Sequence, residues 1–182
     1  MTSTQFPAPI EQEQSLTDRF LSAFRNHPGG VAVVTADAGK GPVALTATSV
    51  SSFSVDPPMI MFSASVRSSS TPTISKAETL VVHLLDEEDL PLAQLCATSG
   101  VDRFADTASW DRLPGGEVRF HRAASWLRSR VLQTVEVHGS LVVLAEVIEA
   151  GGRNTDSAHV PGAPLVYHAR SWHALGESSK IN

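Results

Sequence analysis

Residues 43–62 read VALTATSVSSFSVDPPMIMF, and this stretch decides how the rest of the chain is interpreted. Three short runs rich in apolar and β-branched residues follow one another at 43–47, 51–55 and 59–62, with Asp56-Pro57-Pro58 between the last two. Runs of this length, bounded by turn residues, are typical of β-strands. The run at 59–62 is apolar at every position, so we expect that strand to be buried on both faces of a sheet.

Further strands are predicted on both sides of this stretch, and helices are few. The run at 141–149 is apolar on both faces, which predicts a central place in the sheet. Ser15 with Asp18 resembles a helix capping box, so a helix is expected from Ser15 to the break at His27. Many short strands with few helices indicate a barrel or a sandwich. The other expected strands are 31–36, 79–85, about 125–137, 165–168 and 171–173, the other helices about 71–77 and 86–98, and a loop covers 151–162.

Length and composition limit the class of protein. The 182 residues suit one domain, which we place at 15–182 after a polar tail at 1–14. The net charge is −5 and Lys and Arg form no block, which argues against nucleic acid as a partner. No run approaches the roughly 18 apolar residues of a membrane span, so no membrane partner is expected. The single cysteine, Cys96, excludes an internal disulfide and suits a cytoplasmic location.

Familiar catalytic motifs do not occur in the sequence. The seven histidines form neither H-x-H nor H-E-x-x-H, so no metal site is predicted. There is no G-x-S-x-G elbow, no G-x-G-x-x-G and no P-loop. Cys96 stands on an apolar helix beside Leu95, where cysteine is usually a small core residue.

Two hydroxyl-rich segments, 46–52 and 63–71, are attached to predicted strands. The second follows a buried strand and precedes a helix, and it contains Arg67. Backbone N–H groups at a helix start, serine hydroxyls and an arginine are able to hold a phosphate. A solvated serine-rich loop with a helix cap would have the same composition. The residues alone leave both interpretations open.

Several segments together, in their order and spacing, resemble the flavin reductase family with the split β-barrel fold, the reductase partners of two-component flavin monooxygenases. The resemblance extends from about Phe20 to Leu175. One family segment, usually Val-Asn-Val-Leu, stands here as Val82-His83-Leu84-Leu85. The other matching segments are Phe24-Arg25, Pro28–Thr35, Thr46–Ser49, Ser54–Ile60, Ser65–Thr71, Arg103-Phe104, Trp110 and Pro164–Tyr167.

The resemblance implies a mainly β split barrel that binds FMN, or alternatively FAD, and takes hydride from NADH or NADPH. It also implies a homodimer with the flavin near the two-fold interface, and a flavin-dependent monooxygenase that receives reduced flavin. No catalytic acid or base is implied. The flavin contacts carried over by position are Thr46, Thr48 and Ser49 along the ring and ribityl chain, Ser63, Ala64 and Ser65 at the strand end, Ser69 and Ser70 at the phosphate, and Cys96 beside the flavin.

One segment departs from the family. Where relatives carry Gly-Asp-His before a long strand, this chain has His138-Gly139-Ser140. The family histidine lies on the nicotinamide side, so Ser140, which takes its position, is expected there. Tyr167 is also expected on that side. His138 itself is interpreted as a turn residue. The resemblance therefore predicts an NAD(P)H:flavin oxidoreductase, weakened by this change. The alternative is a flavin-binding protein or carrier without nicotinamide-dependent turnover.

Overall fold

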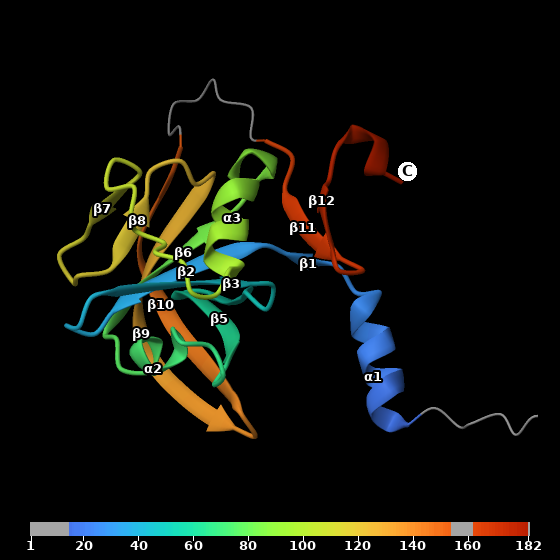
Figure 1. Cartoon of the computed structure of the whole chain (residues 1–182), viewed down its shortest axis with the longest axis horizontal. Coiled ribbons are helices and arrows are strands. Elements are labelled where there is room, and N and C mark those ends of the chain that lie inside the picture. Colours follow the sequence, from blue (N-terminus) through green and yellow to red (C-terminus); the bar gives the residue numbers. More distant parts are fainter. Residues whose placement is uncertain (1–14, 154–161, 182) are drawn as a thin grey trace, which may run out of the picture.

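The computed structural model describes residues 15–153 and 162–181, and one seven-stranded antiparallel sheet forms its centre (Figure 1). The strand order is β3-β2-β6-β9-β10-β5-β4. The two edge strands, β3 and β4, are consecutive in the chain and are joined by residues 48–50. This architecture confirms the predicted mainly β class. The strands are β2 Ala32–Asp37, β3 Pro42–Ala47, β4 Ser51–Val55, β5 Pro58–Ser65, β6 Thr79–Leu84, β9 Ser125–Val137 and β10 Ser140–Gly152.

Buried side chains pack on both faces of β2. Val34 belongs to a cluster with Phe62 and Val143 inside the curve of the sheet. Its neighbour Val33 belongs to a second cluster with Phe120, under a helix and a small hairpin. Successive side chains on a strand point to opposite faces, and every residue of β2 is buried. This strand therefore joins the two halves of the core.

The expectation that β5 is buried on both faces is wrong. Ile60 and Phe62 are buried, but Met59 and Met61 are only partly buried on the outer face, where Ser63 is exposed. The physical reason is that the helices α2 (Thr71–Ile74) and α3 (Leu90–Ala97) pack on β2 and β3 and leave the outer face of β5 uncovered. The strand β10 lies between β9 and β5, which confirms its predicted central position.

The helices beside the sheet are short. Asp86 caps η1 (Glu87–Asp89) through a complete capping box with Asp89, at the acidic helix start that the sequence predicts. The helix predicted at 71–77 is a single turn. A two-stranded hairpin interrupts the segment after α3. The elements are α2 Thr71–Ile74, η1 Glu87–Asp89, α3 Leu90–Ala97, β7 Trp110–Arg112 and β8 Val118–Phe120.

A separate part of the chain, here called the arm, extends from the sheet (Figure 1). It consists of a small sheet, β1-β11-β12, and the helix α1, which Ser15 caps as predicted. No residue of α1 is buried, and its apolar residues Leu16, Phe20, Leu21 and Phe24 are each more than half exposed. The arm contains α1 Leu16–Arg25, β1 Gly29–Gly30, β11 Leu165–His168, β12 Ser171–Ala174 and η2 Glu177–Ser179.

The described residues contain neither a membrane-spanning helix nor a cluster of metal ligands. No helix in these ranges is long and apolar enough to cross a membrane. No group of three His, Cys, Asp or Glu side chains is arranged to hold a metal ion within the same ranges. The predicted tail at 1–14 and most of the predicted loop at 151–162 lie outside the described residues.

Candidate functional site

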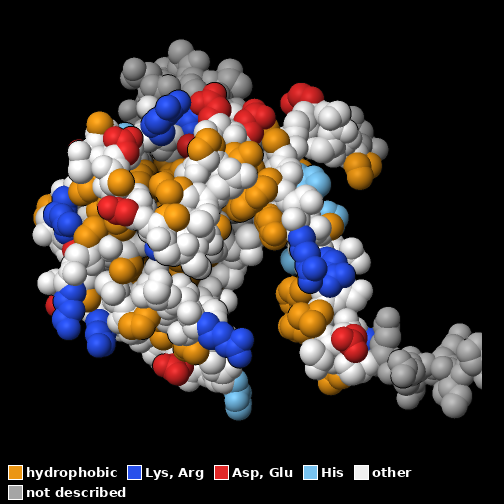
Figure 2. Space-filling model, viewed as in Figure 1, with side chains coloured by type: hydrophobic (Ala, Val, Ile, Leu, Met, Phe, Trp, Pro, Cys, Tyr) orange, Lys and Arg blue, Asp and Glu red, His pale blue; other side chains and the backbone are white. Residues whose placement is uncertain are grey.

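A cavity of about 780 Å³ lies between the arm and the open edge of the sheet. Figure 2 shows the hollow, with apolar side chains of α1 on the side that faces the body of the protein. Pockets for cofactors commonly have about 300–1,000 Å³ and combine apolar walls with a few polar groups. The side chains that decide its character are Leu21 and Phe24 from α1, Thr48, Ser49 and Ser63 from the sheet, and Tyr167 from β11.

One wall of the cavity depends on a close backbone approach. A Cβ atom on Gly29 would lie 2.9 Å from the carbonyl oxygen of Thr48, so only glycine fits there without displacement. Gly29 also pairs with Tyr167 in the register of β1 with β11. Two of the predicted site residues, Thr48 and Tyr167, are thus brought together by a glycine from a third segment of the chain.

Ser49 fixes the end of the sheet that borders the cavity. Its hydroxyl donates to the carbonyl oxygen of Ser63 at 2.8 Å and accepts the N–H of Ser63 at 3.1 Å. Both bonds attach residues 48–50 to β5, although Ser49 and Ser63 are distant in sequence. Ser49 therefore positions Thr48 and Ser63, which are both exposed toward the cavity.

The serine-rich loop after β5 folds back on Ser65. The Ser65 carbonyl accepts bonds from the Thr71 hydroxyl at 2.7 Å and the Ser68 N–H at 3.0 Å. Ser69 is exposed, and its hydroxyl has no hydrogen-bond partner among the described residues. Ser70 points the other way, because its buried hydroxyl donates to the carbonyl oxygen of Ala44 at 2.8 Å. The loop thus presents Ser65 and Ser69 to solvent and uses Ser70 as an internal tie.

Three further predicted contacts have half-buried or buried side chains. The hydroxyl of Thr46 donates to the carbonyl oxygen of Ala93 at 2.7 Å and ties β3 to α3. Ala64 is buried in the core. Cys96 is also buried, and this burial raises the pKa of its thiol to about 12. Cys96 therefore has the properties of a core residue rather than of a nucleophile.

The segment that departs from the family lies beside the serine-rich loop. His138 and Gly139 have φ angles of 46° and 83° and form the turn between β9 and β10, as interpreted for His138. The carbonyl oxygen of Gly139 accepts the N–H of Val66 at 3.0 Å. Ser140 lies opposite Ser65 in the register of β10 with β5. The altered residue and the proposed flavin segment are therefore neighbours on one face.

Four basic residues that line the cavity were missed by the sequence analysis: Arg25, His27, His168 and Arg170. No motif spacing could have found them, because the two pairs are far apart in the sequence and only the arm brings them together. Arg25 lay within a matching segment, but its position gave no indication of a cavity. No acidic residue is among the cavity's described lining residues.

The residues around the cavity fit a flavin. A flat ring system needs an apolar surface and close backbone approach, which Phe24 and the Gly29–Thr48 contact provide. Exposed hydroxyls at Thr48 and Ser63 suit a polar chain attached to the ring. Ser65, Ser69 and Arg67 are exposed farther along the same segment, where a phosphate would be accessible to them.

Comparison with known proteins gives a consistent result. The family model described as a flavin reductase like domain matches residues 24–176. An NADH:FMN oxidoreductase of Rhodococcus qingshengii is 42% identical over 149 residues, which cover 82% of this chain and 77% of that protein. The reductase component of a 4-nitrophenol 4-monooxygenase/4-nitrocatechol 2-monooxygenase of Rhodococcus opacus is 34% identical over 149 residues, covering 80% and 76%. A flavin reductase domain protein from Arthrobacter sp. FB24 has a TM-score of 0.81 at 29% identity, covering 88% of this chain and 96% of that one.

Proposed function

The chain belongs to the flavin reductase family, and on that basis we propose that it is an NAD(P)H-dependent reductase of FMN, with FAD as the alternative flavin. The observation that carries this proposal is the cavity at the open edge of the sheet. Its walls are built from the segments in which the family resemblance places the flavin. When bound, the flavin supplies the redox chemistry by accepting a hydride from reduced nicotinamide at N5.

The residues of the chain orient the two cofactors and exclude water. Hydride transfer depends mainly on distance and alignment. We propose that Thr48 and Ser63 contact the flavin from the edge of the sheet, and that Tyr167 and Ser140 lie toward the nicotinamide. Ser65 and Ser69 are proposed to bind the flavin phosphate, with Arg67 beside them.

The remaining predicted contacts are proposed to act as supports. Thr46, Ser49 and Ser70 each use a hydroxyl to tie one segment to another, at 2.7 to 2.8 Å. Ala64 and Cys96 fill the core beneath these segments. Such residues hold the exposed hydroxyls in place without needing to touch the flavin.

We also propose a homodimer formed through the outer face of β9, β10 and β5. In this face Val142 lies between Val135 and Ser63, and Leu144 lies beside Met61. The solvent side of an antiparallel sheet is normally polar, but here Val135 is 41% exposed among apolar neighbours. The apolar residues of this outer face are Met59, Met61, Val135, Val137, Val142 and Leu144.

A second copy of the chain is the partner that best suits this face. A two-fold interface buries the same patch on both copies, so an apolar patch matches itself. Ser63 and Ser65 lie on the same face, which supports a flavin position at the edge of the proposed interface. The exposed apolar side of α1 supplies a second surface for the partner, since an isolated helix of ten residues is marginal in water.

Reduced flavin is proposed to pass to a flavin-dependent monooxygenase, and in support the Rhodococcus opacus relative is named as the reductase component of a monooxygenase. A cytoplasmic location stays a prediction.

The test of the proposed function is stopped-flow reduction of flavin. Purified protein is mixed with FMN or FAD and then with NADH or NADPH, and flavin absorbance is followed in all four combinations. The proposal expects reduction that is faster than in protein-free mixtures in at least one of them. If the protein binds flavin tightly but accelerates flavin reduction in none of the four combinations, the result would instead support the alternative function, a flavin carrier without nicotinamide-dependent turnover.

A further inference from the structure

Part of the cavity lining is basic, although the chain as a whole has a net charge of −5. Arg25, His27, His168 and Arg170 line it, and no acidic side chain is among the described lining residues. Five other arginines of the described residues, Arg112, Arg119, Arg128, Arg130 and Arg153, have carboxylate partners, for example Arg119 with Asp111 at 2.7 Å. Neither Arg25 nor Arg170 has an ion pair with a described residue. Two arginines left without counter-charges in a cavity are well placed to bind an anion.

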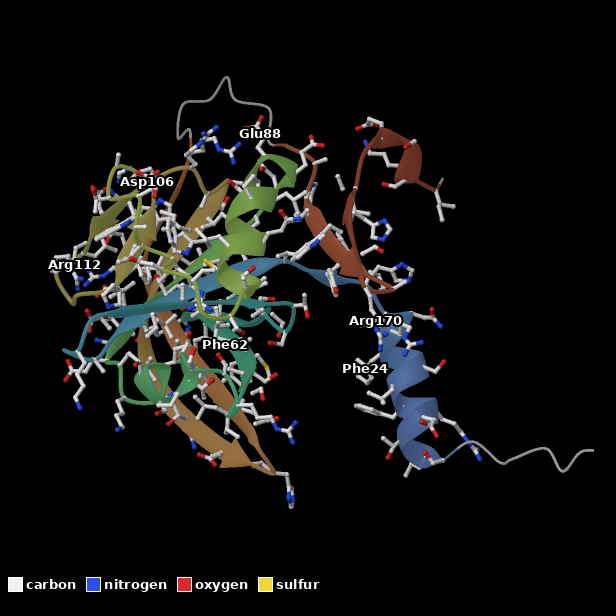
Figure 3. The ribbon with its side chains drawn as sticks, viewed as in Figure 1. Phe24, Phe62, Glu88, Asp106, Arg112 and Arg170 are labelled. Atoms are coloured by element: carbon white, nitrogen blue, oxygen red, sulfur yellow. The ribbon has the colours of Figure 1, made fainter. Side chains whose placement is uncertain are left out.

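The fold joins the two arginines by a backbone contact. Arg25 is the last residue of α1, and its carbonyl oxygen accepts the N–H of Ala169 at 3.1 Å. Ala169 and Arg170 are the two residues of the turn between β11 and β12. Figure 3 shows Arg170 where the small sheet of the arm meets α1, close to Phe24. This contact holds the end of α1 against the turn that carries Arg170.

The backbone of this turn is strained, because two residues with side chains have positive φ angles. Ala169 and Arg170 have φ angles of 49° and 64°, and such two-residue hairpin turns normally contain Asn-Gly or a similar pair. A residue with a Cβ is less stable than glycine in this conformation. A basic side chain at the end of α1 is explained by the helix dipole, but that explanation does not extend to Arg170.

The phosphate of the flavin does not account for these arginines. Ser65 and Ser69, which are proposed to bind that phosphate, do not line the cavity. A nicotinamide dinucleotide brings a diphosphate of its own, and guanidinium groups bind phosphate oxygens in pairs. We propose that Arg170, with Arg25, binds the diphosphate of the nicotinamide dinucleotide and so positions the nicotinamide in the cavity. This inference rests on the proposed reductase function.

Arg170→Gly is the informative variant, because glycine suits the positive φ of the turn and the substitution removes the whole arginine side chain with its guanidinium. Binding of NAD⁺ to flavin-loaded protein is measured by calorimetry, and KM and kcat are measured with the active nicotinamide. Loss of one hydrogen bond to a charged group should raise the NAD⁺ Kd and the KM about tenfold to hundredfold, with a smaller change in kcat. Arg170→Lys should recover part of the affinity through charge alone.

Two matched controls isolate the effect. Ala169→Gly relaxes the same turn and keeps the guanidinium, and Arg122→Gln removes an exposed arginine outside the cavity; both should bind NAD⁺ as the unmodified protein does. FMN and riboflavin affinities should be unchanged in all variants. If Arg170→Gly binds NAD⁺ normally while turnover is intact, the inference fails and the proposed function stands. If Arg170→Gly weakens binding of FMN but not of riboflavin, Arg170 binds the flavin phosphate and the inference is overturned. Absence of turnover in the unmodified protein would refute the proposed function itself.

Discussion

Ser140 lies directly opposite Ser65 in the antiparallel pairing of β10 with β5. Both side chains are exposed on the outer face of the sheet. This relationship places the residue that replaces the family's histidine beside the loop that is proposed to bind the flavin phosphate.

Restoring the family pattern should therefore increase turnover. An imidazole at position 140 reaches farther than a serine hydroxyl and can order the nicotinamide. We expect Gly139→Asp with Ser140→His to raise kcat/KM about tenfold, the effect of one added hydrogen bond of roughly 1.4 kcal/mol. A Cβ at position 139 would meet only Val66, at 3.8 Å, and Asp tolerates the positive φ better than most residues. Ser140→His alone separates the two changes, and unchanged kinetics in both variants would contradict the assignment.

The two adjacent serines of the loop should behave differently. Ser69→Ala should weaken FMN binding by about 1 kcal/mol and leave riboflavin binding unchanged, because only the phosphate contact is lost. Ser70→Ala should leave the ratio of the two affinities unchanged and lower the free energy of unfolding by about 1–3 kcal/mol, because the Ala44 carbonyl loses its buried donor. Flavin titrations and urea denaturation measure both effects. If Ser70→Ala selectively weakens FMN, the orientation described for Ser70 is wrong.

Two neighbouring glycines provide a matched pair. Gly29→Ala introduces a Cβ 2.9 Å from the Thr48 carbonyl, whereas Gly30→Ala meets no atom within 4 Å. The first variant must displace Thr48, and overpacking of this kind costs about 1–3 kcal/mol. We expect flavin affinity to fall in Gly29→Ala and to remain normal in Gly30→Ala. Equal affinities, measured by fluorescence titration, would show that Thr48 does not contact the flavin.

His83 should make stability depend on pH. Burial lowers its pKa to about 4 from 6.5, and its ring is bonded to the Val33 carbonyl and the Phe120 N–H, each at 3.0 Å. Between these pH values the unfolded chain binds a proton that the folded chain does not. The free energy of unfolding should therefore decrease as the pH falls from 6.5 toward 4, by up to about 3 kcal/mol. His83→Asn should flatten this slope in a series of urea denaturations at different pH values.

The proposed dimer depends on the outer face of the sheet. Val135→Lys places a charge among apolar neighbours of both copies, so the dimer should dissociate. Sedimentation should then change from twice the chain mass of 19.4 kDa to a single chain. Leu95→Lys, on the exposed side of α3, is the control that should remain dimeric. A monomer before any substitution would contradict the proposal.

Much of the fold could be predicted because its strands have clear patterns. The strand at 125–137 was predicted with the bounds it has, and the helix at Ser15 was indicated by its cap. The outward direction of Met59 and Met61 could not be predicted, because a wholly apolar run has no alternation to show which face is covered. The opposite orientations of Ser69 and Ser70 depend on a bond to Ala44 in another strand. Arg170 became visible as a cavity residue only when the arm brought it to Arg25.

The two edges of the seven-stranded sheet meet at residues 48–50, in the segment where the flavin is proposed to bind. A ligand held there connects the two edges while it is present and separates from both when it leaves. Binding to the folded state alone stabilises it by about 2.7 kcal/mol when free ligand is at a hundred times its Kd. A reductase that hands its flavin to another enzyme gives up this stabilisation in each cycle. Its melting temperature is thus set by the flavin concentration around it as well as by its sequence.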